Sequence, residues 1–242
     1  MARYGMRVTL LGLAFVLVTV PFAILLFEVV AEGPLTHLDS SIANWMNSWV
    51  HGHPLLVTTL ERVGWFGWPL WLGIMVTAGS VYAFWRGRRR LAIYLVVTVV
   101  GGSLVDTAVK VLVNRPRPVV DHPLDTAFGT SFPSGHSMAS TLTYGALVLA
   151  FLPVLSRRAR RWAVAGAVVM VLAIGCSRLL LGMHFLTDVL GGYVLGFAWL
   201  IGATAVFEIW REEEGRPHAT PTDVVTEGVE PEAAPALLGQ ER

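Results

Sequence analysis

Cysteine and lysine are almost absent from this 242-residue chain. The one cysteine, Cys176, has no partner for an intrachain disulfide. Only one of the 18 basic residues is a lysine, Lys110. Charged residues make up 14% of the chain, against 54% hydrophobic residues and a mean hydropathy of +0.60. This scarcity of charge excludes an ordinary soluble domain and indicates a protein that crosses a membrane several times.

Six apolar runs are long enough to cross a bilayer, which takes roughly 20 residues each. The first run exceeds the apolar region of a signal peptide, ~7 to 15 residues, and lacks a clear cleavage site, so we interpret it as a retained anchor helix bent at Pro21. The predicted fold class is therefore all-α, a bundle of six transmembrane helices. The runs cover residues 8–30, 66–85, 91–113, 136–154, 162–181 and 185–210.

Arginine clusters predict which side of the membrane each loop faces. "RGRRR" at 86–90 and "RRARR" at 157–161 each hold four arginines, and Arg3 and Arg7 precede the first run. Loops rich in arginine stay in the cytoplasm, so we expect both termini there and the segments 31–65, 114–135 and 182–184 outside. Because topology explains the basic runs, we expect no binding of nucleic acid.

The first outer segment, 31–65, has Ile42, Trp45, Met46 and Trp49 at helical spacing. This pattern predicts a helical stretch that lies along the membrane interface. The neighbouring "HGH" has no acidic or cysteine companions, so a metal site there is not expected.

The end of the chain differs from the rest. Residues 211–242 hold eight acids against three arginines, together with prolines, alanines and no apolar periodicity. We expect two parts: a membrane domain at 1–210 and a disordered acidic cytoplasmic tail at 211–242.

The stretch "DTAVKVLVNRPRP", 106–118, places charges at the outer end of the third run. Two prolines predict that the helix ends near Asn114, after which Arg117 can turn back toward Lys110. An ionisable side chain within a span is costly and therefore a functional candidate. The alternative is a structural lysine that snorkels and pairs with Asp106.

The stretch "PSGH" begins the fourth run. Pro133 sets the chain direction, and Gly135 lets the backbone approach a ligand closely. Ser134, Gly135 and His136 are therefore expected to present free N–H groups at a helix start, which suits phosphate. An ordinary helix start is the alternative for these four residues taken alone.

The third polar block is "SRLLLGMHFLTD", 177–188. Arg178 closes the fifth run, Gly182 permits a tight turn, and His184 precedes Asp188 by one helical turn. A carboxylate at that spacing would fix the imidazole tautomer and make the other ring nitrogen a better nucleophile.

Counting the crossings brings all three blocks to one membrane face. There His184 is placed to attack phosphorus, and His136 can give a proton to the leaving oxygen, with a phosphohistidine as the intermediate. Lys110, Arg117 and Arg178 would stabilise the charge that develops on the phosphoryl oxygens. No acidic cluster has the spacing of metal ligands, so we expect neither metal nor cofactor.

The three blocks resemble the three-part signature of the type 2 phosphatidic acid phosphatase family, over about residues 64–205. The resemblance implies a six-helix membrane lipid phosphatase with His184 as nucleophile, His136 as acid and Asp188 as the support of His184. Thr187 stands where many relatives carry proline and touches no catalytic role. The resemblance also implies a set of phosphate-binding residues: Lys110, Arg117, Ser134, Gly135 and Arg178.

The substrate that the resemblance implies is a lipid phosphate in the outer leaflet of the plasma (inner) membrane. We favour undecaprenyl diphosphate because the chain has a compact six-span form, with phosphatidylglycerol phosphate and phosphatidic acid as alternatives. Transfer of phosphate to a lipid acceptor at the same site stays open. A small-molecule transporter is the alternative from another class, but its charges should be spread through the membrane depth.

Overall fold

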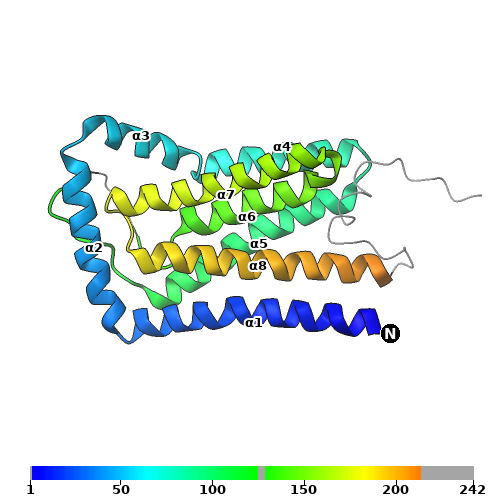
Figure 1. Cartoon of the computed structure of the whole chain (residues 1–242), viewed down its shortest axis with the longest axis horizontal. Coiled ribbons are helices and arrows are strands. Elements are labelled where there is room, and N and C mark those ends of the chain that lie inside the picture. Colours follow the sequence, from blue (N-terminus) through cyan, green and yellow to red (C-terminus); the bar gives the residue numbers. More distant parts are fainter. Residues whose placement is uncertain (1, 125–128, 214–242) are drawn as a thin grey trace, which may run out of the picture.

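The computed structural model describes residues 2–124 and 129–213, and all regular elements in these ranges are helical (Figure 1). This confirms the all-α prediction for the described part of the chain. The elements are α1 (Ala2–Val30), α2 (Pro34–His51), α3 (Pro54–Trp65), α4 (Pro69–Trp85), α5 (Arg89–Val113), α6 (Gly135–Phe151), a 3₁₀ turn at Leu152–Val154, α7 (Arg157–Leu180) and α8 (Leu186–Glu213).

Local sequence signals account for the helix boundaries. Helices α2, α3 and α4 each begin with proline, whose fixed φ suits the first helical position. The side chain of Ser134 accepts from the backbone N–H of Ser137 and so caps α6. Helix α5 ends where Asn114 adopts a left-handed conformation with φ of 47°. The predicted end of the third run near Asn114 is thus confirmed.

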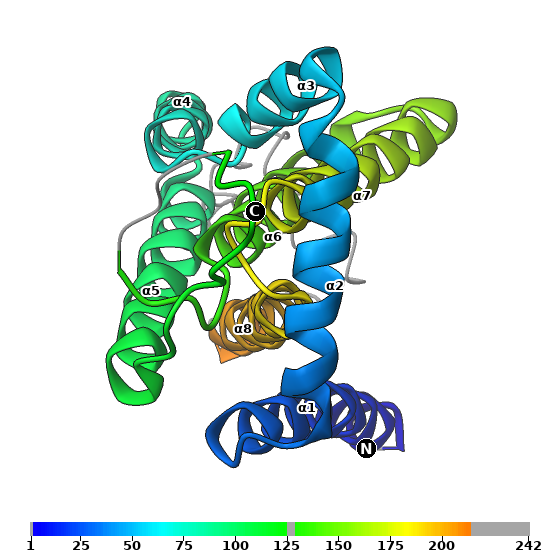
Figure 2. The same cartoon turned by 90° about the vertical axis from the view of Figure 1, so that its left-hand side faces the viewer.

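Helix α6 is the centre of the bundle, because it packs against α4, α5, α7 and α8. Helix α1 lies along α8, and α2 crosses one end of the bundle (Figures 1 and 2). The buried core between α4, α5, α6 and α8 is aliphatic apart from Tyr94 and Met138. The fold therefore has an apolar body and one end that is covered by α2.

In the part of the chain that the structure describes, three helices are long and apolar enough to cross a membrane: α5, α7 and the stretch Leu186–Phe207 of α8. A fourth crossing is possible if Val16–Val30 of α1 and α2, which meet at an angle of 82°, form one broken span. Helices α4 and α6 have 17 residues each, somewhat under the roughly 20 that a span takes. Helices lie at all six predicted positions, but the count of six spans stays a prediction.

The predicted interfacial segment forms two helices, α2 and α3. Trp45 and Trp49 of α2 are exposed, as expected for side chains at a membrane interface. The buried face of α2 carries Asp39, Ala43, Asn47 and Val50, and α2 packs on α7 and α8. Half of this face is polar, a feature that the apolar spacing did not reveal.

Helix α8 continues to Glu213, so it includes the first three residues of the segment predicted as a tail. The remaining part of that prediction, 214–242, lies outside the described residues. Cys176 is exposed on α7, as its lack of a disulfide partner allows.

Two glycines of α8 permit its close contact with α6. A Cβ atom on Gly192 would lie 2.6 Å from the carbonyl oxygen of Ser134, and one on Gly196 would lie 3.0 Å from the Cβ of Thr141. The four-residue spacing of Gly192 and Gly196, in "GGYVLG" at 191–196, therefore serves packing within the bundle.

Gly192→Ala is expected to lower the free energy of unfolding by about 1–3 kcal/mol, because the added methyl meets backbone that cannot move aside. Gly202→Ala on the same helix is the matched control, since no atom beyond its chain neighbours and the helix's own backbone lies within 4 Å of its Cβ position. Thermal unfolding of both variants in detergent checks the prediction. An equal effect of the two substitutions would contradict it.

Candidate active site

The three predicted polar blocks meet at the end of the bundle that α2 crosses. This end gathers the C-terminal ends of α5 and α7 and the N-terminal ends of α6 and α8 (Figure 1). Lys110, Arg117, Arg178 and His184 all lie within electrostatic range of His136. The structure thus brings together residues that are up to 74 positions apart, as the crossing count predicted.

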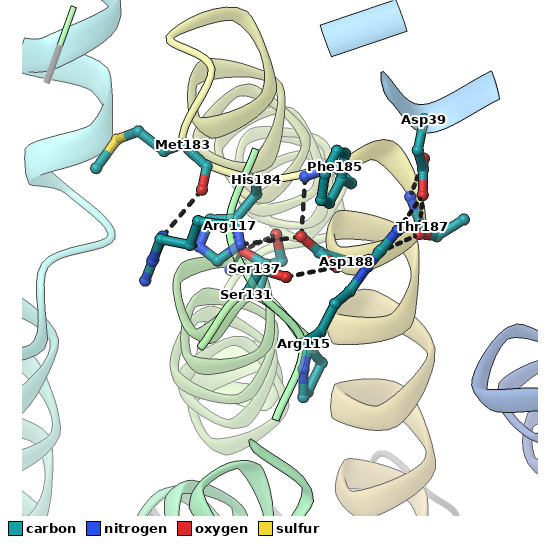
Figure 3. Close-up of polar contacts among 12 residues, drawn as sticks. Asp39, Arg115, Arg117, Ser131, Ser137, Met183, His184, Phe185, Thr187 and Asp188 are labelled. Atoms are coloured by element: carbon teal, nitrogen blue, oxygen red, sulfur yellow. Dashed lines mark hydrogen bonds and ion pairs between the residues drawn. The ribbon is translucent and has the colours of Figure 1, made fainter. Parts of the chain in front are cut away.

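The imidazole of His184 lies between a carboxylate and a guanidinium (Figure 3). Its Nδ1 is 3.4 Å from Oδ2 of Asp188, and its Nε2 is 3.3 Å from an Nη of Arg117. A guanidinium can only donate, so Nε2 must be the acceptor and the ring proton of neutral His184 sits on Nδ1. The Nε2 electron pair therefore faces the cationic side of the site.

Burial lowers the pKa of His184 below the ordinary value for histidine, because surroundings of low polarity disfavour the charged ring. The hydrogen bond and the charge of Asp188 raise this pKa, while Arg117 and Lys110 lower it further. His184 is only 3% exposed and lies in the turn before α8. The ring is therefore neutral at neutral pH, which is the form that can attack an electrophile.

Both oxygens of Asp188 are held by other groups. Oδ2 accepts from the backbone N–H of Phe185 at 2.8 Å in addition to facing His184. Oδ1 accepts from Arg115 at 2.6 Å and lies 3.5 Å from the hydroxyl of Ser131. These contacts fix the rotamer of Asp188 and hence the orientation of the imidazole.

A buried cluster behind Asp188 was not predicted from the sequence (Figure 3). Arg115 also donates to Asp39 of α2 at 2.9 Å and to the hydroxyl of Thr187 at 2.8 Å. The backbone N–H of Thr187 donates to Asp39 at 3.1 Å, and its hydroxyl donates to the same carboxylate. Thr187, for which no catalytic role was expected, thus contacts both Asp39 and Arg115 directly beside Asp188.

The only sequence signals for this cluster are weak. Asp39 is the one acid in α2, and Arg115 stands two residues before Arg117 in "NRPRP". The face of Phe185 covers the Arg115 guanidinium at 4.2 Å, which adds a cation–π contact.

Lys110 combines the two interpretations that the sequence left open. Its Nζ lies 2.8 Å from each oxygen of Asp106, the pairing that a structural lysine would make. The same Nζ donates to the carbonyl oxygen of Pro133, directly before the start of α6. Gly135 lies against both side chains, since a Cβ there would be 3.4 Å from Nζ. The ammonium group is therefore at the turn that is predicted to bind phosphate as well as in an ion pair.

One predicted donor is already used. The backbone N–H of Ser134 was expected to be free, but it donates to the carbonyl oxygen of Asp188 at 2.9 Å. Gly135 and His136 begin α6, where first-turn amides lack acceptors within the helix. The prediction of free amides at this helix start is therefore left to Gly135 and His136, and the Ser134 amide instead ties α6 to α8.

Arg178 is buried at the end of α7, where its Nε lies 3.2 Å from the hydroxyl of Ser177 and an Nη lies 3.1 Å from the sulfur of Met183. Its other Nη occupies space that Gly64 of α3 leaves open, because a Cβ there would come within 1.6 Å. Gly182, with φ of 72°, makes the tight turn that follows.

Within residues 2–124 and 129–213, no group of three or more His, Cys, Asp or Glu side chains is placed to hold a metal ion. In the "HGH" stretch, His51 stacks on His122 with ring centroids 4.0 Å apart, and His53 bonds the carbonyl of Trp49.

Known proteins resemble this chain in sequence. A family model described as the PAP2 superfamily matches residues 91–212. Phosphatidylglycerophosphatase B of Bacillus subtilis is 32% identical over 159 residues, which cover 63% of this chain and 70% of that protein. Lipid A 1-phosphatase of Rhizobium johnstonii is 29% identical over 189 residues, 73% and 69% of the two chains. Undecaprenyl-diphosphatase BcrC of Bacillus subtilis is 31% identical over 111 residues, which cover 44% of this chain and 53% of that protein.

A solved structure has the same fold. The crystal structure of the transmembrane PAP2 type phosphatidylglycerolphosphate phosphatase from Bacillus subtilis matches with a TM-score of 0.74 at 23% sequence identity. The match covers 85% of this chain and 98% of that one. The chain therefore belongs to the PAP2 superfamily. The prediction of a hydrolase of the lipid phosphatase class is confirmed.

Proposed function

We propose that this enzyme removes the terminal phosphate of a membrane lipid through a phosphohistidine on His184. The observation that carries the proposal is the orientation of His184, whose protonated Nδ1 faces Asp188 while Nε2 faces Arg117. Nε2 attacks phosphorus, the bond between phosphorus and the lipid oxygen breaks, and His136 gives that oxygen its proton. The lipid leaves as an alcohol or a monophosphate.

Water completes the reaction. His136, now deprotonated, takes a proton from a water molecule as that water attacks the phosphohistidine. The P–N bond breaks, inorganic phosphate leaves, and both histidines return to their first state. Throughout, Lys110, Arg117 and Arg178 face the phosphoryl oxygens together with the first amides of α6, so that charge in the transition state is met by fixed donors.

The charges of the site support a reaction without a metal ion. Three cationic side chains surround the histidines, and the nearest carboxylates, Asp106 and Asp188, are held by Lys110 and Arg115. A divalent cation here would meet repulsion, whereas a phosphate dianion meets attraction.

Activity is accordingly expected to persist in excess EDTA, with phosphate release from detergent-solubilised enzyme as the measurement. Loss of activity that added Mg²⁺ or Zn²⁺ restores would contradict the proposal of a metal-free site.

For the lipid, we propose phosphatidylglycerol phosphate ahead of undecaprenyl diphosphate and phosphatidic acid. The similarity to phosphatidylglycerophosphatase B extends over 70% of that protein, against 53% for the undecaprenyl-diphosphatase. This order reverses the preference drawn from the sequence alone. It rests on the extent of similarity, because the phosphate site itself suits any of the three lipids.

We further propose six membrane crossings, the site on the outer face and both termini in the cytoplasm. The two arginine clusters and the N-terminus lie at the end of the bundle away from α2 (Figure 1). Arginine-rich ends stay in the cytoplasm, which puts the α2 end, with its exposed tryptophans, at the outer interface.

The function is tested by incubating purified enzyme with each of the three lipids and measuring inorganic phosphate, with His184→Ala as control. Release from one lipid that the control lacks supports the proposal and ranks the substrates. If labelled phosphate is transferred to an added lipid alcohol and no free phosphate appears, the enzyme is a phosphotransferase and not a hydrolase. No reaction with any lipid would overturn the proposal.

A further inference from the structure

The buried cluster behind Asp188 has more charge than a structural link needs. Its members are Asp39, Arg115, Thr187 and Asp188, and the three charged side chains are 2%, 9% and 0% exposed. Buried charges are costly unless they are paired and hydrogen-bonded. If the cluster only joined α2 to α8, apolar side chains in place of two of these charged ones would do so at a lower cost of burial.

The net charge of Asp39, Arg115 and Asp188 gives a reason for their presence beside His184. If Arg115 alone bound Asp188, the pair would be neutral, and the carboxylate would have little charge left for the imidazole. Asp39 accepts from the other Nη of Arg115, so that two carboxylates share one guanidinium. The cluster then has a net charge of −1, which remains available to His184.

Thr187 adds hydrogen bonds to the cluster that a proline could not make. Its backbone N–H and hydroxyl both donate to Asp39, and the hydroxyl also accepts from Arg115. Proline, which the sequence resemblance leads one to expect at this position, has neither of these donors. Asp39 is the one member of the cluster outside the three signature blocks, and it joins the cluster through Arg115 and Thr187.

We propose that Arg115 and Asp39 are positioning residues for His184, which act on it through Asp188. Arg115 holds the carboxylate with Oδ2 toward the imidazole, and Asp39 preserves the negative charge that stabilises the ring once phosphorylated. This inference rests on the proposed phosphohistidine mechanism and assigns to α2, which lies outside the residues matched by the family model, a part in it.

Other charged groups also face His184, and substitutions of Asp39, Arg115 or Thr187 leave all of them in place. Asp188 comes from α8, Arg117 from the segment after α5, and Lys110 and Asp106 from α5 itself. His136 of α6 and Arg178 of α7 complete the surroundings. Any change in the pH dependence between variants therefore arises from the substituted residue.

The test is the pH profile of kcat/KM, whose acidic limb reports loss of the proton from His184. Asp39→Asn removes a negative charge and should move this limb to lower pH, whereas Arg115→Gln removes a positive charge and should move it to higher pH. Shifts on the order of 0.5 to 1 pH unit are expected. Each variant should also lower kcat by roughly 10- to 100-fold, the range for residues that orient a functional histidine from behind.

The double variant Asp39→Asn with Arg115→Gln returns the net charge of the cluster to −1. Its acidic limb should return close to that of the wild type, although kcat stays low. Thr187→Val is the uncharged control, which removes the hydroxyl hydrogen bonds to Asp39 and Arg115 without changing a charge and should leave the limb in place. A purely structural role predicts no shift, or shifts in one direction for both single variants, and either result overturns the proposal.

Folding is checked by thermal unfolding and size-exclusion chromatography of each variant. If Arg115→Gln does not fold, Asp39→Asn decides alone, because asparagine keeps an oxygen for the Thr187 donors. A shift of its acidic limb to lower pH supports the inference, and an unmoved limb overturns it. If the wild type releases phosphate but the acidic limbs of the variants do not move, this inference fails and the proposed function stands. Absence of wild-type release from every lipid would defeat the proposed function as well.

Discussion

Replacing His184 with alanine is expected to abolish phosphate release, with a fall in kcat of at least about 10⁴-fold. The substitution removes the Nε2 electron pair that faces the cationic side of the site, and no other described side chain has a nitrogen held in the same way between a carboxylate and Arg117. Rapid quenching of a reaction with labelled lipid into base should leave label on the wild type and none on the variant.

A matched histidine controls for general effects of such a substitution. His53 is exposed in the turn between α2 and α3, where its Nδ1 lies 2.9 Å from the carbonyl oxygen of Trp49 and its ring lies against the Trp49 ring. His53→Ala should therefore behave as the wild type. Label on His184→Ala, or phosphate release at a rate close to the wild type, would show that another group is the nucleophile.

Asp188→Asn is expected to lower kcat by about 10³- to 10⁴-fold, as the corresponding change does in a histidine–aspartate pair of a serine protease. Both oxygens of Asp188 accept from donors, namely the backbone N–H of Phe185 and the guanidinium of Arg115. An amide group placed there must point its NH₂ at one of these donors or at Nδ1 of His184. In the latter case the ring proton moves to Nε2, and the nucleophilic electron pair is lost.

The same crowding of donors predicts a cost in stability of about 1–3 kcal/mol for Asp188→Asn. Kinetic measurements should therefore be made well below the melting temperature of the variant. Asp121→Asn, in the exposed segment before α6, is the control for loss of one carboxylate. Turnover near the wild-type value in folded Asp188→Asn would refute the role given to this pair.

The parts of the site that the sequence predicted share one property. Lys110, His184 and Asp188 are polar residues beside long apolar runs, where an ionisable side chain is costly and hence conspicuous. Regular helical spacing then predicted that Asp188 would lie beside the imidazole. The fold class followed from composition in the same way, because apolar runs of this length leave few alternatives.

The parts that were missed depend on contacts between distant segments. Asp39 lies in a polar stretch, where an acid is unremarkable, and its partner Arg115 is 76 positions away. The bond from the Ser134 amide to the carbonyl of Asp188 likewise joins segments that nothing in the local pattern connects. Hydrophobic periodicity describes each helix alone, so it carries no information on which polar faces meet.

The bond between Ser134 and Asp188 has a mechanical effect on the two proposed reacting residues. It joins the first turn of α6, which carries His136, to the first turn of α8, directly after His184. The separation of acid and nucleophile is therefore fixed by main chain as well as by side chains. A thinner or thicker bilayer that tilts the distant ends of these helices would leave the two histidines in register.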